Sequence, residues 1–197
     1  MKINIQIVGV GGQGILTASK ILANAALADG LNVIMSEVHG MAQRGGVVES
    51  SIRIGDVYSP IIGNGKADVI LSFEPMEAYR ALDKANKDTK IVTNIEPMVP
   101  FTVTIGQGEY PPVGGLIEGI KKVTPHVYSF DAFALAREAG TEKAANVVML
   151  GALSALGILP ISPEKMKETV ALTVPAKFRD VNMKAFEMGF EAVKKEK

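Results

Sequence analysis

The first candidate site is a group of glycines between a strand-like apolar run and a helix-like one. Gly9, Gly11 and Gly14 have the G-x-G-x-x-G spacing, with Gly12 and Gln13 between them. Because glycine has no side chain, backbone N–H groups at the start of a helix can approach an anion, commonly a phosphate. Close packing of the strand against the helix needs the same glycines without any ligand. The loop is therefore a candidate phosphate or nucleotide site, and the packing alternative stays open.

Dinucleotide sites usually have a companion acid that binds a ribose hydroxyl, about twenty residues beyond the glycines. Glu37 occupies this position, 23 residues after Gly14. The spacing is slightly long but tolerable. An NAD(P)- or FAD-binding oxidoreductase is therefore one hypothesis, and a module that binds a regulatory adenine nucleotide is another.

The second candidate site is the segment SEVHGMAQRGG at residues 36–46, directly after a predicted strand. Open α/β sheets place their sites at the carboxyl ends of strands. The segment is richer in hydrogen-bonding groups than an ordinary crossover needs, although a solvated loop with glycine turns is the alternative. Its candidate residues are Glu37, His39, Gly40, Gln43, Arg44, Gly45 and Gly46.

Several kinds of chemistry are excluded or unsupported by the sequence. The chain has no cysteine, so disulfides, thiolate metal sites, cysteine nucleophiles and thiolate-held iron–sulfur clusters are absent from it. Glu37 and His39 are too few for a metal site, and His126 lies on a predicted strand, so no metal is expected. No G-x-S-x-G, Walker or H-E-x-x-H motif occurs, and no catalytic residue can be named.

Apolar periodicity and turn residues predict an alternation of strands and helices along the chain. A Pro- and Gly-rich stretch at 97–115 interrupts it as an irregular excursion or mobile loop. Asn146 is expected to be the N-cap of its helix. The predicted strands are 3–8, 31–36, 47–54, 57–62, 68–73, 90–94 and 126–130, and the predicted helices are 14–28, 76–85, 132–139, 146–156, one starting at 162–163, and 175–195.

This order predicts an α/β protein with three α/β/α layers around a Rossmann-like, mostly parallel sheet. The two strands at 47–54 and 57–62, separated by Gly55 and Asp56, are expected to form an inserted β-hairpin. A length of 197 residues suits one substantial domain, so residues 1–197 are expected to be a single domain.

Composition limits the partners of the chain. Lysine plus arginine equals aspartate plus glutamate at 21 each, which argues against nucleic-acid binding. The hydrophobic fraction of 47% is high for a free-standing monomer and suggests buried partner surface. Apolar runs are too short to span a bilayer and the N-terminus lacks a signal-peptide layout, so we expect a cytoplasmic protein.

The ordered set of motifs resembles one known family along nearly the whole chain. GVGGQGILTASKILANAA, SEVHGMAQRGG, IRIGDVYSPII, ADVILSFEPMEAYRAL and VPAKFRDVNMKAFEMG are similar to the gamma-type domain of 2-oxoacid ferredoxin oxidoreductases. The family pattern of glycine, three residues and Arg-Gly-Gly matches residues 40–46. His39 resembles the indolepyruvate branch, where pyruvate-type relatives tend to have tyrosine.

The resemblance implies a subunit of a complex that decarboxylates an aryl 2-oxoacid, forms the arylacetyl-CoA and passes two electrons to ferredoxin. In this family, thiamine diphosphate, magnesium and iron–sulfur clusters reside on a large partner subunit. The missing cysteines agree with this division, as does the GDV at 55–57 where a thiamine diphosphate site would have Gly-Asp-Gly. The family domain lies at the subunit interface, with coenzyme A near it.

Roles for the two loops follow as a hypothesis from this resemblance. Gly11, Gly12 and Gln13 are expected to offer hydrogen bonds to a phosphate or to the partner. Arg44 is expected to pair with a CoA phosphate or a substrate carboxylate, where its bidentate geometry has an advantage over lysine. The alternative is that the whole loop is interface structure. A homodimer through the helix at 146–156 or the helix at 175–195 also stays open.

Overall fold

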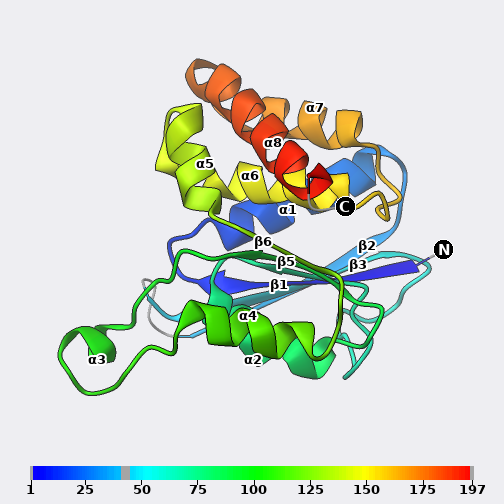
Figure 1. Cartoon of the computed structure of the whole chain (residues 1–197). Coiled ribbons are helices and arrows are strands. Elements are labelled where there is room, and N and C mark those ends of the chain that lie inside the picture. The colour runs from blue at the N-terminus through cyan, green and yellow to red at the C-terminus, as the bar shows by residue number, and fades with distance from the viewer. Residues whose placement is uncertain (1, 41–44, 196–197) are drawn as a thin grey trace.

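The computed structural model describes residues 2–40 and 45–195 and has a central sheet between two helical layers (Figure 1). The strands are β1 (Lys2–Val10), β2 (Val33–His39), β3 (Val47–Gly55), β4 (Val69–Ser72), β5 (Lys90–Asn94) and β6 (Val127–Phe130). The helices are α1 (Ile15–Ala28), α2 (Pro75–Arg80), α3 (Phe101–Thr104), α4 (Val113–Lys121), α5 (Ala132–Ala139), α6 (Ala145–Ala155), α7 (Pro163–Thr173) and α8 (Arg179–Lys194), with short 3-10 turns η1 (Ala81–Lys84), η2 (Glu142–Ala144) and η3 (Ala176–Phe178).

The sheet has the strand order β2-β3-β1-β4-β5-β6. β1, β4, β5 and β6 pair in parallel, whereas β3 is antiparallel to both of its neighbours. α2 and α4 lie on one face, and α1, α5, α6, α7 and α8 lie on the other (Figure 1). The predicted three-layer α/β/α arrangement with a mostly parallel sheet is therefore confirmed.

The predicted hairpin between 47–54 and 57–62 is wrong. β3 is hydrogen-bonded on one side to β1 and on the other to β2, so neither of its edges is free for a further strand. Residues 57–62 contain no strand, and the Arg53 guanidinium instead donates to the carbonyls of Ser59 and Ile61. β3 instead pairs antiparallel with the preceding strand β2 as well as with β1, and so lies between them.

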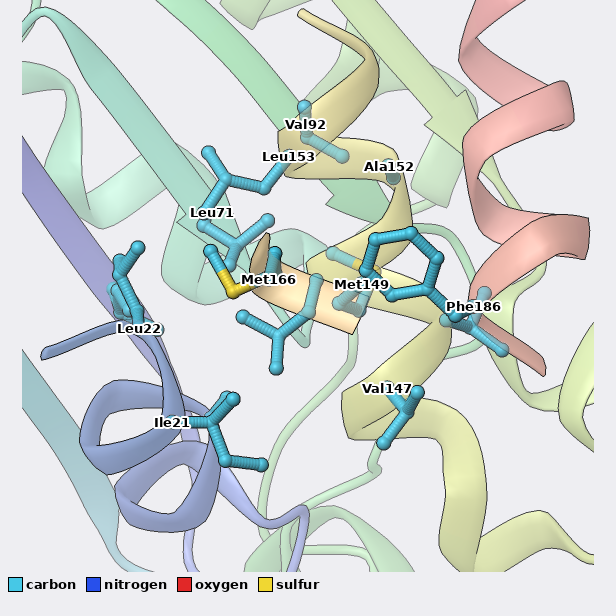
Figure 2. Packing of buried hydrophobic residues seen from close by; sticks show 14 of the residues in the cluster. Ile21, Leu22, Leu71, Val92, Val147, Met149, Ala152, Leu153, Met166 and Phe186 are labelled. Carbon is cyan, nitrogen blue, oxygen red and sulfur yellow. The ribbon is translucent and has the colours of Figure 1, made fainter. Parts of the chain in front are cut away.

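The core on the upper face of the sheet is built around α6 (Figure 2). Ten of its residues are buried, among them Met149 and Leu153. The contact of α6 with α8 is made through the backbone, because a Cβ on Gly151 would lie 2.0 Å from the Phe186 carbonyl oxygen, and one on Gly189 would lie 1.9 Å from that of Val148. The apolar residues of α6 are therefore buried within the chain, and the homodimer considered through this helix or the helix at 175–195 stays a prediction.

Candidate functional site

The glycine loop forms an open helix N-terminus. β1 ends at Val10 and α1 begins at Ile15, with Gly14 as N-cap at φ 82° and no side chain capping the helix. The first helical hydrogen bond runs from the Ala18 N–H to the Gly14 carbonyl. N–H groups of a first turn have no intrahelical partner and carry the positive end of the helix dipole. The N-terminus of α1 can therefore bind an anion.

A cavity of about 530 Å³ lies in front of this helix end. It brings the glycine loop together with the end of β2, so the two candidate loops share one space. The lining is mostly apolar apart from the backbone, Thr17 and His39. The lining residues are Val10, Gly11, Gly12, Gly14, Ile15, Leu16, Thr17, His39, Gly40 and Val48.

The two glycine-rich segments are also hydrogen-bonded to each other. The Gly11 N–H donates to the Gly46 carbonyl at 2.8 Å, and the Gly45 N–H donates to the Gly11 carbonyl at 3.3 Å. Gly12 is exposed at φ 105°, a conformation that favours glycine. Backbone contacts therefore hold residues 45–46 against the turn that leads into α1.

Gln13 and Gly9 help to hold the turn between β1 and α1 in its conformation. The Gln13 side chain is buried; its Oε1 accepts from the Val10 N–H at 2.8 Å, and its Nε2 donates to the Phe73 carbonyl at 3.0 Å. A Cβ on Gly9 would lie 2.7 Å from Gln13 Oε1 and 2.8 Å from the Phe73 Cβ. The expectation that the Gln13 amide faces a ligand is corrected, because both of its ends are bonded inside the protein.

Glu37 and His39 lie on β2, next to β3 rather than next to β1. Glu37 is opposite Ser50 and His39 is opposite Val48. Among the described residues, Glu37 Oε1 and the buried Ser50 Oγ have no hydrogen-bond partner. His39 is exposed and reaches the cavity, whereas Glu37 does not line it. The structure therefore separates the expected companion acid from the glycine turn by one strand.

Gln43 and Arg44 lie outside the described residues, so their predicted roles stay predictions. The predicted capping role of Asn146 is wrong, because the N-cap of α6 is Ala144 and Asn146 lies one residue inside the helix. Its side chain instead packs beside the α1 turn, 3.1 Å from where a Cβ on Gly14 would lie. Nothing in the local sequence around Asn146 indicates this contact, since it joins residues far apart in the chain.

A second group of polar residues, which the sequence did not single out, lies at the start of α2. Glu74 is 1% exposed; its Oε2 accepts from the Glu77 N–H at 3.0 Å and its Oε1 accepts from the Tyr110 hydroxyl. Burial raises the pKa of Glu77, while Arg80 at 2.9 Å works against the rise. Burial, followed by the hydrogen bond to Glu74, also raises the pKa of Tyr110. The only sequence signal was the Glu74-Pro75 pair after a strand, typical of a helix start.

These residues line a cavity of about 390 Å³ on the α2 side of β1. Val10 lines both this cavity and the one in front of α1, so the two flank the carboxyl end of β1. Along residues 2–40 and 45–195, no three His, Asp or Glu side chains gather as metal ligands would. The described part of the site in front of α1 offers mainly backbone groups for binding.

Comparison with known proteins identifies the family. The family model described as pyruvate ferredoxin/flavodoxin oxidoreductase matches residues 4–192. The chain belongs to this family. Indolepyruvate oxidoreductase subunit IorB from Archaeoglobus fulgidus is 45% identical over 96% of this chain and 94% of its own length. The protein of the same name from Pyrococcus horikoshii is 47% identical over 97% of this chain and 96% of its own length.

The solved structure of the keto/oxoacid ferredoxin oxidoreductase gamma subunit from Geobacter sulfurreducens has the same fold. The two chains superpose with a TM-score of 0.72 at 28% identity, covering 98% of this chain and 99% of that one. The pyruvate ferredoxin/flavodoxin oxidoreductase match includes both candidate loops and the strands that position them. None of the described helices has the length and apolar composition needed to cross a membrane.

Proposed function

We propose that the chain is the small subunit of an indolepyruvate:ferredoxin oxidoreductase. The complex converts an aryl 2-oxoacid such as indolepyruvate or phenylpyruvate, together with CoA, into arylacetyl-CoA and CO2. Two electrons pass to ferredoxin. The observation that supports this proposal is the 41–47% identity, over nearly the full chain, to subunits named for indolepyruvate. The alternative of a self-sufficient NAD(P)- or FAD-binding oxidoreductase finds no support among these relatives.

The redox groups of such a complex do not fit this chain. An iron–sulfur cluster needs thiolates, and the sequence has no cysteine. The described residues also offer no cluster of carboxylates or histidines for magnesium at a diphosphate. We therefore assign thiamine diphosphate, magnesium and the clusters to a large alpha subunit, which passes electrons to ferredoxin. The complex is expected in the cytoplasm.

The small subunit contributes binding at the carboxyl edge of its sheet. The open N-terminus of α1 supplies N–H groups and a positive dipole end, which suit a phosphate of CoA. Arg44 adds a positive charge to the adjoining segment, and a bidentate pair with a CoA phosphate or a substrate carboxylate is its proposed role. The competing role for both loops is contact with the large subunit.

Reconstitution tests the proposed function. The small chain and its large, iron-containing partner are purified separately and mixed, and reduction of ferredoxin is followed with indolepyruvate and CoA. We expect activity only from the mixture, with a requirement for both substrates. Hydride transfer from NADH by the isolated small chain would overturn the proposal.

A variant separates the two roles of the second loop. If Arg44 pairs with CoA or substrate, Arg44→Ala in the assembled complex raises the KM of that ligand while the complex stays intact. If the loop is interface only, the variant weakens assembly and leaves both KM values unchanged. Size-exclusion chromatography of the mixture distinguishes the outcomes.

A further inference from the structure

The segment between β5 and α4 forms a projection at residues 97–108. It leaves the body at the same end of the molecule as the carboxyl end of β1, and α3 lies at its tip (Figure 1). The tip exposes large apolar side chains: Phe101 is 74% exposed and Ile105 is 48% exposed. Met98 and Val99 are exposed beside them. Contiguous apolar side chains on a protruding element are typical of a contact surface.

The projection is a built element rather than a loose loop. The N–H groups of Val103 and Thr104 donate to the Pro100 carbonyl, and the Ile105 N–H donates to the Phe101 carbonyl. Phe101 and Ile105 are four residues apart, so the helical turn places them on one side. A preformed recognition element loses less conformational entropy when it binds.

Both ends of the projection are fixed to the body. On the first side, Asn94 is buried; its amide donates to the carbonyls of Phe73 and Glu96. On the second side, the Tyr110 hydroxyl donates to the buried carboxyl group of Glu74. The direction in which the tip points is therefore set by two hydrogen-bonded anchors.

Charge indicates what kind of surface the tip meets. Residues 97–108 contain no Asp, Glu, Lys, Arg or His, in a chain in which 21% of residues are charged. Permanent interfaces are apolar with few charges at their centre, whereas brief electron-transfer encounters bury little surface. An uncharged apolar tip therefore suits a permanent partner better than ferredoxin.

We propose that residues 97–108 are the docking element for the large subunit, and that Phe101 and Ile105 insert into an uncharged apolar groove on it. The inference rests on the proposed function. The position of the projection supports the choice of partner: Pro100 and Val103 of the projection line one cavity together with Val10 at the end of β1. A large subunit held by the tip is thereby brought against the edge of the sheet that bears the candidate site.

Binding of the separately purified large subunit to the full-length small chain tests this surface. The variant is Phe101→Ser with Ile105→Ser, and the control is Leu172→Ser on α7, where Leu172 is 76% exposed. We expect the Kd for the large subunit to rise at least about tenfold in the double variant, because apolar anchors dominate interface energies. The control is expected to keep the wild-type Kd, and both variants to keep the wild-type Tm. Turnover of the double variant recovers when the small chain is added in excess.

Two results would overturn the inference. An unchanged Kd in the double variant would remove the tip from the interface. Loss of self-association by the isolated small chain, with an unchanged Kd for the large subunit, would assign the tip to a second copy. Failure of the wild-type chains to bind each other at all would instead contradict the proposed function, so the two failures are distinguishable.

Discussion

Two helices start at the same edge of the sheet, and only one of their N-termini is capped by a side chain. α1 follows β1 and has Gly14 as its N-cap, with no side-chain cap and a cavity in front of it. α2 follows the neighbouring strand β4 and has Glu74 as its N-cap, whose buried carboxyl group accepts a hydrogen bond from the Glu77 N–H. The first helix end is left open, and the second is closed by a side chain of the protein.

The difference shows that a helix N-terminus becomes a candidate site only when the chain leaves it unfilled. Both ends offer unpaired N–H groups and the positive end of a helix dipole. At α2 the Glu77 N–H is satisfied by the Glu74 carboxyl group, and the same carboxyl group also anchors Tyr110. One helix end is thus available to a ligand, while the other holds a neighbouring segment in place.

Removing the carboxyl group from α2 has the largest expected effect. Glu74→Ala removes an N-cap and leaves the Tyr110 hydroxyl without its acceptor, so the free energy of unfolding should fall by about 2–4 kcal/mol. Urea unfolding of the isolated chain at pH 7 measures the change. The control is Glu118→Ala on the exposed side of α4, for which we expect a change within about 0.5 kcal/mol. Equal effects of the two variants would contradict the role given to Glu74.

Crowding the open N-terminus of α1 is expected to have the second-largest effect on stability. Gly14→Ala places a side chain at φ 82°, which costs about 1–2 kcal/mol, and brings its Cβ to 3.1 Å from the Asn146 amide. Gly30→Ala is the matched control, with φ 72° and nothing within 4 Å of the new Cβ. Thermal unfolding should show a larger loss for Gly14→Ala. A larger loss for Gly30→Ala would mean that the Asn146 contact is unimportant.

A third variant places a negative charge at the open N-terminus of α1 and tests whether that end binds a phosphate. Thr17 is exposed in the first turn of α1 and lines the cavity. Thr17→Asp should stabilise the chain by about 0.3–1 kcal/mol through the helix dipole. In the assembled complex the same carboxylate should repel a phosphate and raise the KM for CoA about tenfold, equivalent to about 1.4 kcal/mol. Asn24→Asp, later on the exposed side of α1, is the control. An unchanged KM in Thr17→Asp would place CoA elsewhere.

The smallest expected effect is on how the stability of the chain depends on pH through Glu77 in the first turn of α2. Burial raises the pKa of Glu77 above its ordinary 4.5, so the folded state holds this proton more tightly than the unfolded state does. The group therefore costs stability as the pH rises from 4.5 through the folded pKa, and the cost persists above it. Glu77→Gln should be less sensitive to pH in this window. Urea midpoints at several pH values measure the slope, and parallel curves for wild type and variant would refute the expectation.

Elements defined by local signals were predicted from the sequence. β5 and α5 have the predicted bounds of 90–94 and 132–139. Ser162 was the expected start of α7, and its hydroxyl oxygen accepts from the Lys165 N–H at 3.1 Å. Each of these depends on residues within a few positions of one another, where periodicity and capping chemistry decide the outcome.

Features that depend on distant parts of the chain were missed or mistaken. The position of β3 between β1 and β2 depends on which strands pair across the sheet. The alternation of polar and apolar residues along a strand does not specify its partners. Glu74 and Tyr110 are 36 residues apart. Gly14 meets Asn146 only after α6 has packed against α1. The candidate site was located from its glycines, whereas the internal bonding of Gln13 required knowing where Phe73 lies.

The glycine contact between α6 and α8 also has a consequence for how the chain folds during synthesis. α6 leaves the ribosome before α8, yet the side of α6 that faces α8 is covered only when Gly151 and Gly189 have brought the two backbones together. Until then this side of a helix with ten buried residues stays uncovered, and exposed apolar surface on a nascent chain favours aggregation. The α6–α8 contact can therefore form only after nearly the whole chain has been synthesised.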